Sequence, residues 1–334
     1  TCVGVGQQSI GIANHVFDWV IIDEAARSQS GELAIAMQSG KRVLLVGDHH
    51  QLPPNYSQEQ KAEVARKLRH SYGRLDHDEL DELLKSDFER AFRSPYGAQA
   101  SASLLTQYRM ATPIGNMVSD IFYDGKLKSA GRIVSGCYGQ NVEVLSSSVT
   151  WIDTSDQGRH AYHTDADQNG KLFNHVEAKA IITMLKQISK DTALIDHLNE
   201  VRKVDPAIGI ICMYAEQKRR IQRLFNQNQW PEGFKSLVKI DTVDSYQGKE
   251  NRIIIISITR SDSNNTPGFM KLPNRINVAL SRAMDRLIIV GNKNVWTGRN
   301  SVLPFGQVVS YMQSYGEDAG YSFVSSKKLK GGAA

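Results

Sequence analysis

The 334-residue chain is predicted to be an α/β protein with two parallel-sheet domains. Runs of β-branched apolar residues alternate with stretches in which apolar residues recur at helical spacing. Several of the apolar runs end in acidic or polar residues, as expected at the carboxyl edge of a parallel sheet, where α/β proteins bind ligands. A chain of this length can bury two cores of ordinary size. We therefore expect two successive α/β units, with the boundary near Gln107.

The composition limits the possible partners and compartments. The net charge of +5 and the pI near 8.9 permit a polyanionic partner without requiring one. Cys2, Cys137 and Cys212 are too few and too scattered for a zinc site or a disulfide framework, which agrees with a reducing compartment. No stretch reaches the length of a membrane-spanning helix, and no signal peptide opens the chain. We expect an intracellular protein, cytoplasmic or in the nucleus or nucleoid, with no membrane attachment.

The first predicted strand, residues 20–22, ends directly in Asp23 and Glu24. Two adjacent carboxylates at this place call for a cation. In proteins that hydrolyse ATP or GTP, the first acid holds Mg²⁺ through its water shell and the second polarises the attacking water. The alternative is the acidic first turn of a helix, which the helix dipole stabilises. The strand by itself does not decide between these interpretations.

The next segments complete a βαβ unit. A helix is predicted over 27–37, and a second buried strand over 41–47 leads to Asp48, before two prolines at 53–54 end regular structure. Both strands thus deliver acids at the same end. Residues 58–92 are highly charged and helix-favouring. We interpret them as a solvated helical excursion in preference to a partner-binding arm.

The second unit follows the same alternation. Thr112 and Pro113 begin a predicted helix that runs to Phe122, and residues 129–170 are expected to form loops around short strands. The short strands are predicted at 142–145 and 149–152, the later strands at 208–212, 238–243, 252–258 and 286–291, and the later helices at 174–189, 216–226 and 277–283. Residues 327–334 are predicted to be a disordered tail.

Five spaced motifs together resemble motifs II to VI of the superfamily 1 helicases. They are DEAA at 23–26, GDHHQLPP at 47–54, QYRM at 107–110, TVDSYQGKE at 242–250 and NRINVALSRA at 274–283. More narrowly, the chain resembles the branch that contains the RNA-surveillance and Okazaki-fragment helicases. The resemblance implies two RecA-like domains of the P-loop NTPase type. Residues 1–106 would be the C-terminal part of the first domain, incomplete at its N-terminus, and residues 107–326 the second.

The resemblance assigns roles in ATP hydrolysis to the first unit. Asp23 resembles the Mg²⁺-holding acid of the Walker B motif, and Glu24 resembles the general base. Gln51 is an amide that can donate to a γ-phosphate oxygen and orient a water; its alternative role is to stabilise a turn.

In the second unit, Arg109 and Arg282 stand where the family has its two phosphate-contacting arginines. A guanidinium can hold phosphoryl oxygens bidentately, although either residue could be a structural ion-pair partner. Tyr108 resembles the aromatic residue that stacks on adenine, and plain packing is its alternative. Gly248 and Glu250 are expected at the cofactor, with Glu250 near the ribose or γ-phosphate.

The polar loop between two predicted strands carries the expected nucleic-acid contacts: Thr242, Asp244, Ser245 and Gln247. Short hydroxyl and amide side chains with a following glycine allow close approach to a sugar-phosphate backbone without reading bases. The resemblance makes this the loop that couples nucleotide state to grip on the strand. The basic helix with lysine and arginines at 218–223 could also contact phosphates, but a solvated face is the commoner explanation.

The implied function is an ATP-dependent helicase or translocase. It would use ATP and Mg²⁺, bind ATP in a cleft between the two domains, and move along single-stranded DNA or RNA, 5′ to 3′ by analogy with the branch. Its rival is a degenerate, non-catalytic module that binds nucleic acid or a partner protein. A second rival is the motor part of a nuclease-associated or anti-phage protein. The retention of Asp23, Glu24, Gln51, Arg109 and Arg282 argues against a non-catalytic module.

One family motif is missing from the sequence. No G-x-x-x-x-G-K-[ST] string, the loop whose lysine binds the β- and γ-phosphates, occurs in the chain. In the family this loop lies upstream of the DEAA motif. We therefore expect it in an N-terminal part of the same protein that is absent from this sequence, and we expect this chain alone to hydrolyse ATP poorly or not at all.

Overall fold

The computed structural model describes residues 17–73, 76–167, 170–202 and 205–329. The chain divides into two compact units, residues 1–103 and 104–334. The boundary expected from the sequence lay between residues 106 and 107. Each unit is described by itself below.

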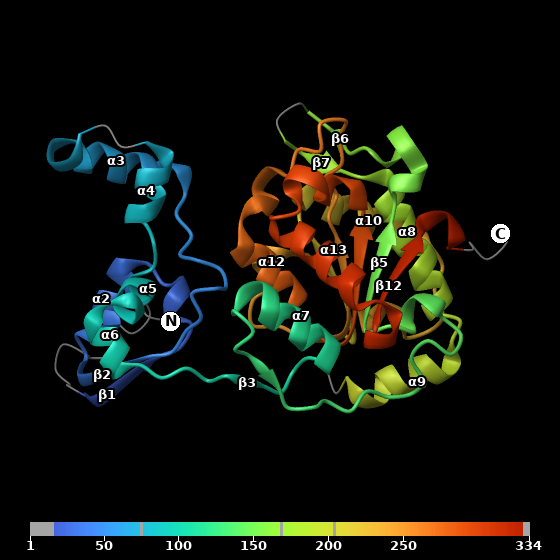
Figure 1. Cartoon of the computed structure of the whole chain (residues 1–334), viewed down its shortest axis with the longest axis horizontal. Coiled ribbons are helices and arrows are strands. Elements are labelled where there is room, and N and C mark those ends of the chain that lie inside the picture. The colour runs from blue at the N-terminus through green and yellow to red at the C-terminus, as the bar shows by residue number, and fades with distance from the viewer. Residues whose placement is uncertain (1–16, 74–75, 168–169, 203–204, 330–334) are drawn as a thin grey trace. The chain divides into compact units, whose positions relative to one another are not determined.

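Unit 1 contains a two-stranded parallel sheet and several helices (Figure 1). Its elements are β1 Phe17–Ile22, the 3₁₀ turn η3 Ala25–Arg27, α2 Ser30–Met37, β2 Gly40–Leu45, α3 Gln58–Tyr72, α4 His77–Leu83, α5 Asp87–Arg93 and α6 Pro95–Ala100. The strand–helix–strand order predicted for residues 20–47 is confirmed, since β1 and β2 are parallel neighbours joined through α2. The charged stretch 58–92 is helical, as expected, in three pieces.

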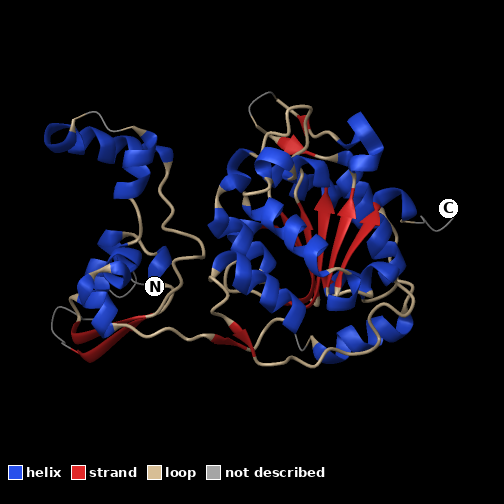
Figure 2. Ribbon diagram, viewed as in Figure 1, coloured by secondary structure: helices blue, strands red, loops and turns tan. Residues whose placement is uncertain are grey.

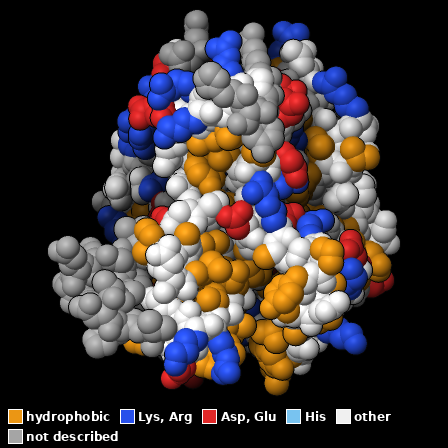
Figure 3. All heavy atoms as spheres, turned by 90° about the vertical axis from the view of Figure 1, so that its left-hand side faces the viewer, with side chains coloured by type: hydrophobic (Ala, Val, Ile, Leu, Met, Phe, Trp, Pro, Cys, Tyr) orange, Lys and Arg blue, Asp and Glu red, His pale blue; other side chains and the backbone are white. Residues whose placement is uncertain are grey.

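The prediction that β1 and β2 are buried is wrong for one face of their sheet. Side chains alternate between faces along a strand, and Phe17, Trp19 and Ile21 of β1 are 49%, 55% and 67% exposed. Leu44 of β2, the register partner of Ile21, is 46% exposed. In the part of the chain that the structure describes, the small apolar cluster of unit 1 lies on the other face, around Ile22. Exposed hydrophobic side chains are also conspicuous on the surface shown in Figure 3.

Unit 2 is built around a six-stranded sheet. The unit also contains two small two-stranded sheets, β3-β4 and β6-β7. The strands of unit 2 are β3 Thr106–Gln107, β4 Lys128–Ser129, β5 Val149–Asp153, β6 Thr164–Asp165, β7 Leu172–Phe173, β8 Ile208–Cys212, β9 Val238–Thr242, β10 Asn251–Ser257, β11 Ala283–Gly291 and β12 Tyr321–Ser325. Its α-helices are α7 Thr112–Phe122, α8 His175–Ile188, α9 Thr192–Val201, α10 Ala215–Gln227, α11 Phe234–Leu237, α12 Pro273–Leu280 and α13 Pro304–Tyr315. Its 3₁₀ turns are η4 Glu143–Leu145, η5 Ser155–Ala161, η6 Val243–Tyr246, η7 Gly268–Lys271, η8 Lys293–Trp296, η9 Gly298–Asn300, η10 Glu317–Ala319 and η11 Ser326–Lys328.

The large sheet has the order β12-β5-β11-β10-β8-β9, and all its neighbouring pairs are parallel. Helices cover both faces (Figure 2). The helices α8 and α10 pack on one face, and α7, α12 and α13 contact one another on the other. Every residue of β8 is buried, because a central strand covered on both sides takes apolar side chains on both. The protein is thus an α/β protein of the predicted class.

Two predicted elements of unit 2 need correction, and others were missed. The predicted strand at 142–145 is instead the 3₁₀ turn η4, preceded by Val142, because Leu145 N–H donates to the Val142 carbonyl (2.9 Å) and the apolar side chains pack into the core. The prediction of a disordered tail over 327–334 is wrong for its first residues, which belong to η11. The Nζ of Lys327 donates to the Asp156 carbonyl (2.6 Å). Residues 330–334 lie outside the described residues. The elements α9, α13 and β12 were not predicted.

The connection between β9 and β10, residues 243–250, runs from the carboxyl ends of the strands to their amino ends. Because β9 and β10 are parallel, this segment must run from the carboxyl edge back to the amino edge. It crosses β8 at Gly209, where an added Cβ would lie 2.4 Å from the Tyr246 hydroxyl and 2.4 Å from Asn251 Oδ1. Glycine at this strand position therefore makes room for the crossing chain.

We predict that Gly209→Ala destabilises unit 2 by about 1–3 kcal/mol, because the new methyl group overpacks the crossing point. Gly136→Ala is the matched control, since nothing lies within 4 Å of the position that its new methyl group would take. Denaturant unfolding monitored by tryptophan fluorescence measures both. Equal stability of the two variants would show that the crossing segment is not held against β8.

Candidate functional site

The acidic pair of unit 1 lies in a tight turn directly after β1. Glu24 has a φ of 56°, and its N–H donates to Asp23 Oδ1 (2.9 Å). The turn is fastened to the end of β2 by a bond from Ala25 N–H to the Val46 carbonyl (2.9 Å). A Cβ at Gly47 would lie only 2.9 Å from Ala26 N, so glycine permits this close approach. The segments after the two strands therefore meet at one edge, as the sequence predicted, and both acids are exposed there.

Gln51 belongs to the turn that follows β2. Its Nε2 donates to Asp48 Oδ2 (2.9 Å), and its N–H donates to the Asp48 carbonyl (3.1 Å). Asp48 Oδ1 also accepts from His50 N–H (2.9 Å). Asp48 therefore orients the Gln51 amide and was missing from the predicted site. Its sequence signal was present, since it is the acid that ends the second strand.

In unit 2, three predicted residues meet at the amino edge of the large sheet. Arg109 forms an ion pair with Glu250 through its Nε, and its guanidinium also donates to the Ser281 carbonyl (3.3 Å). Glu250 directly precedes β10, and Arg282 directly precedes β11. Tyr108, next to Arg109, is 76% exposed. Residues more than 100 positions apart in the sequence are thus brought together at this edge.

Arg282 is the most buried member of this set, at 2% exposure. Its Nε donates to the Val278 carbonyl (3.1 Å), one terminal nitrogen to the Lys249 carbonyl (3.4 Å) and the other to Ser281 Oγ (3.1 Å). These bonds tie the end of α12 to the start of β10. They fit the structural alternative, since at least three of the five guanidinium N–H groups are engaged by protein groups.

The predicted strand-contacting loop starts at the opposite, carboxyl edge. Thr242 ends β9, and its hydroxyl lies 3.3 Å from Ser245 Oγ. Asp244 is engaged in an ion pair with Arg275 of α12 (3.2 Å). Gln247 is half-buried, and Gly248 has a φ of 75° close to the start of β10. The loop residues therefore do not form one cluster but are spread along the connection from one edge to the other.

An aromatic and arginine cluster beside this loop was missed by the sequence analysis. The rings of Tyr214 and Phe269 lie 4.9 Å apart, and the Arg275 guanidinium lies 5.1 Å from the Phe269 ring centre. Through Asp244, Arg275 joins this cluster to the loop. Tyr214 follows β8 at the carboxyl edge, a position that could have marked it. Both rings are half-buried. Partly accessible aromatics interleaved with arginine are typical of single-strand binding surfaces.

A buried polar network holds the carboxyl end of β10. Glu177 of α8 accepts from Ser257 Oγ (2.6 Å) and from Thr259 N–H (2.7 Å), and Gln217 donates to Ser257 Oγ (2.9 Å). Thr259 has a φ of 72°, which is rare for a β-branched residue and costs about 1–3 kcal/mol. The network therefore maintains a strained backbone close to the Tyr214 cluster. Complete burial raises the pKa of the Glu177 carboxyl to about 8, although both hydrogen bonds oppose this shift.

The raised pKa of Glu177 predicts a pH-dependent stability. Between about pH 4.5 and 8 the unfolded chain loses the proton while the folded chain keeps it, so stability falls as pH rises through this window. The Glu177→Gln side chain cannot ionise, so the free energy of unfolding of this variant should not fall in this way. The difference in free energy of unfolding between variant and parent should therefore grow with pH, by at most about 1.4 kcal/mol for each pH unit within this window. The measurement is denaturant unfolding at pH 5 and pH 8, with exposed Glu143→Gln as control. A difference between parent and Glu177→Gln that does not change with pH would contradict this account.

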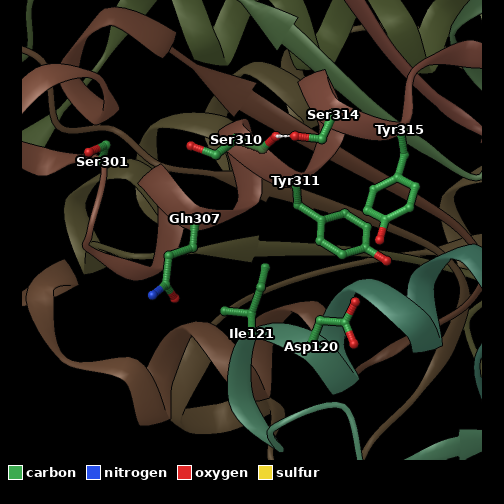
Figure 4. Close-up of a pocket in the computed structure, with 8 residues that line it drawn as sticks. All are labelled: Asp120, Ile121, Ser301, Gln307, Ser310, Tyr311, Ser314 and Tyr315. Carbon is green, nitrogen blue, oxygen red and sulfur yellow. Dashed lines mark hydrogen bonds between the residues drawn. The ribbon is translucent and has the colours of Figure 1, made fainter.

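A pocket of about 480 Å³ lies between α7 and α13, lined by Asp120, Ser310, Tyr311 and Tyr315 among others (Figure 4). None of the predicted site residues lines it. In the part of the chain that the structure describes, no group of three or more His, Cys, Asp or Glu side chains is arranged to hold a metal ion. None of the helices described is long and apolar enough to cross a membrane.

Comparison with known proteins identifies the family. Residues 83–294 match the model of an AAA domain family, and residues 1–59 match a second family model with the same description. The class defined by this match and by the parallel sheet is that of the P-loop ATPases with RecA-like domains. Within that class, the chain belongs to the superfamily 1 helicases, in the group of the RNA-surveillance and Okazaki-fragment helicases.

Two curated relatives agree with this assignment, and one solved structure is similar in fold. The chain is 28% identical over 317 residues to the DNA replication ATP-dependent helicase/nuclease DNA2 of Saccharomyces cerevisiae, covering 88% of this chain and 18% of that protein. It is 30% identical over 305 residues to the ATP-dependent helicase upf1 of Schizosaccharomyces pombe, covering 88% of this chain and 28% of the relative. A solved complex of the arterivirus nonstructural protein 10 helicase with DNA matches at 13% identity and a TM-score of 0.36, over 83% of this chain and 40% of that one. The chain thus spans less than a third of the length of these two curated relatives.

Proposed function

We propose that this chain is the motor part of an ATP-dependent helicase or translocase that moves along single-stranded DNA or RNA. The convergence of Arg109, Glu250 and Arg282 at one edge of the unit 2 sheet carries this proposal. These residues come from three separated motifs, and together they bring two guanidinium groups and a carboxylate to one place, a set suited to binding phosphoryl oxygens. The proposal extends the helicase class of the family to the activity of this particular chain.

Each unit supplies part of the ATP chemistry in this proposal. Glu24 accepts a proton from the attacking water, and Gln51, oriented by Asp48, positions that water. Arg109 and Arg282 stabilise negative charge on the transferring phosphoryl group. Before ATP binds, Glu250 neutralises Arg109 through their ion pair. Exchange of this partner for a phosphate would link nucleotide binding to the start of β10.

The residues of unit 1 fit a magnesium ion. The Asp23 carboxylate is exposed, and one of its oxygens bonds to the Glu24 N–H, which fixes its direction. A carboxylate of this kind would hold Mg²⁺ through the ion's water shell. When bound with ATP, the ion supplies charge neutralisation between the phosphates.

The strand would lie along the carboxyl edge of unit 2. Thr242 and Ser245 offer hydroxyls to a sugar-phosphate backbone, and Tyr214 and Phe269 offer ring faces on which bases stack. None of these contacts distinguishes DNA from RNA. We propose a 5′ to 3′ direction by analogy with the family branch. A motor that consumes ATP on nucleic acid works inside the cell, in the cytoplasm or in the nucleus or nucleoid.

The exposed apolar face of β1 and β2 supports a further part of the proposal. Phe17, Trp19, Ile21 and Leu44 form a face that a stable protein covers. We propose that an N-terminal part of the same protein packs on this face and carries the missing phosphate-binding loop. The small share of each curated relative that the chain spans is consistent with a longer protein.

A non-catalytic module is the second candidate. The observation that favours it is the position of Arg282, whose guanidinium is buried and bonded to protein groups. In that case the chain would bind a strand or a partner protein without turnover.

The first test measures ATP hydrolysis by this chain with and without oligo(dT) and oligo(U), using Glu24→Gln as the blank. We expect no activity above the blank, because the loop that binds the β- and γ-phosphates is absent from the sequence. Strand-stimulated hydrolysis that is lost in Glu24→Gln would contradict the proposal that this chain is an inactive part of the motor.

Strand binding is tested separately, by fluorescence anisotropy with labelled oligo(dT) and oligo(U). Tyr214→Ala removes one ring face and should weaken binding by about 1–3 kcal/mol. Tyr315→Ala, on α13 away from the cluster, is the matched control. If the parent chain binds neither oligonucleotide, or if both variants bind as the parent does, the assignment of the strand surface fails.

A further inference from the structure

Two lysine ammonium groups lie close to one tyrosine ring beside β9, the outermost strand of the large sheet. Lys239 lies on the edge strand β9 and is the register partner of Gly209, so it shares the face over which the connection 243–250 crosses. Its Nζ lies 5.9 Å from the centre of the Tyr246 ring, and the Nζ of Lys249 lies 6.0 Å from the same centre. The two cations reach the ring from different segments of the chain.

Three acids near this pair are bound to other cations. Asp241 pairs with Lys218 (2.7 Å), Asp244 with Arg275 (3.2 Å) and Glu250 with Arg109. Among the described residues, neither Lys239 nor Lys249 forms an ion pair with a carboxylate, and Lys249 Nζ donates instead to the Ser245 carbonyl (2.7 Å). The pair therefore carries two positive charges that no local carboxylate neutralises at contact distance.

Repulsion between the two ammonium groups is a cost in the absence of a ligand. The neighbouring Lys249 is the largest cause of a lowered pKa at Lys239, and burial adds to it. Asp241 and Asp205 act in the opposite direction with smaller effect. Lysines protect edge strands from pairing, which accounts for Lys239 alone. It does not account for a second ammonium group brought to the same ring by the crossing connection.

We propose that Lys239 and Lys249 bind a phosphate group beside the Tyr246 ring. An anion between the two nitrogens would replace their repulsion with two charge-assisted hydrogen bonds. Lys249 precedes Glu250, and its carbonyl accepts from Arg282, so the site adjoins the residues assigned to the nucleotide. The phosphate can come from a nucleotide or from the backbone of the strand. This assignment of sources rests on the proposed function, whereas the anion site itself does not.

The anion site is tested on the full chain labelled with ¹³C at lysine Cε, by NMR titration with pyrophosphate. Lys239→Gln and Lys249→Gln assign the two signals, and exposed Lys186 of α8 serves as the internal control. We expect saturable shifts at Lys239 and Lys249, and a titration midpoint of Lys239 that moves to higher pH when pyrophosphate is bound. Small, unsaturated shifts that are equal at all three lysines would overturn the proposal.

The source of the phosphate is decided with the double variant Lys239→Gln/Lys249→Gln and the control Lys186→Gln. If the strand supplies it, the slope of log affinity for oligo(dT) against log salt should fall by about 0.7 for each phosphate lost. If the nucleotide supplies it, the Kd of a fluorescent ADP analogue should rise about tenfold, with the salt slope for oligo(dT) unchanged. Unaltered binding of both ligands in the double variant would overturn the site as a phosphate contact. Failure of the parent chain to bind either ligand would contradict the proposed function instead, and the pyrophosphate titration would still decide the lysine pair.

Discussion

The structure of unit 2 depends on the geometric requirement that the chain return from the carboxyl edge to the amino edge between two parallel strands. β10 spans seven residues, so the connection covers about 20 Å without a covering helix of its own. It does so close against the sheet, because Gly209 leaves room for Tyr246. The route places Thr242 at one edge and Glu250 at the other. A single short segment therefore carries the residues assigned to the strand and those assigned to the nucleotide.

Helix α12 is fastened to the same segment at both of its ends. Arg275 in its first turn pairs with Asp244 near the carboxyl edge, while Arg282, just beyond its last turn, donates to the Lys249 carbonyl near the amino edge. Glu250 in turn pairs with Arg109. Strand-binding and phosphate-binding groups are thus joined through one helix and one connection. A ligand that binds at one end of the connection can therefore affect the other end. If it displaces a guanidinium or a carboxylate, the former partner of that group is left unpaired and must rearrange.

The sequence predicted the elements whose signals are local. Continuous apolar runs located β8, β10 and β11, and Thr112 with Pro113 located the start of α7. Exposure of Phe17 and Trp19 was not predicted, because an apolar run does not reveal whether both faces of its sheet are covered. Tyr214 was missed because its role arises from a contact with Phe269, which lies in a distant stretch of the chain. Asp48 stands in the same motif as Gln51, but only the folded turn shows that its carboxylate accepts from the Gln51 amide. The motifs indicated Arg282, but its burial depends on the packing of α12 against the connection.

The central claim is that the connection 243–250 links the two edges of the sheet, and hydrogen–deuterium exchange of the backbone amides tests it most directly. The measurement compares the chain alone with the chain saturated with oligo(dT). The account predicts slower exchange both at Asp244–Tyr246, near the carboxyl edge, and at Lys249–Asn251, at the amino edge. Protection confined to the carboxyl edge, with unchanged exchange at Lys249–Asn251, would contradict it.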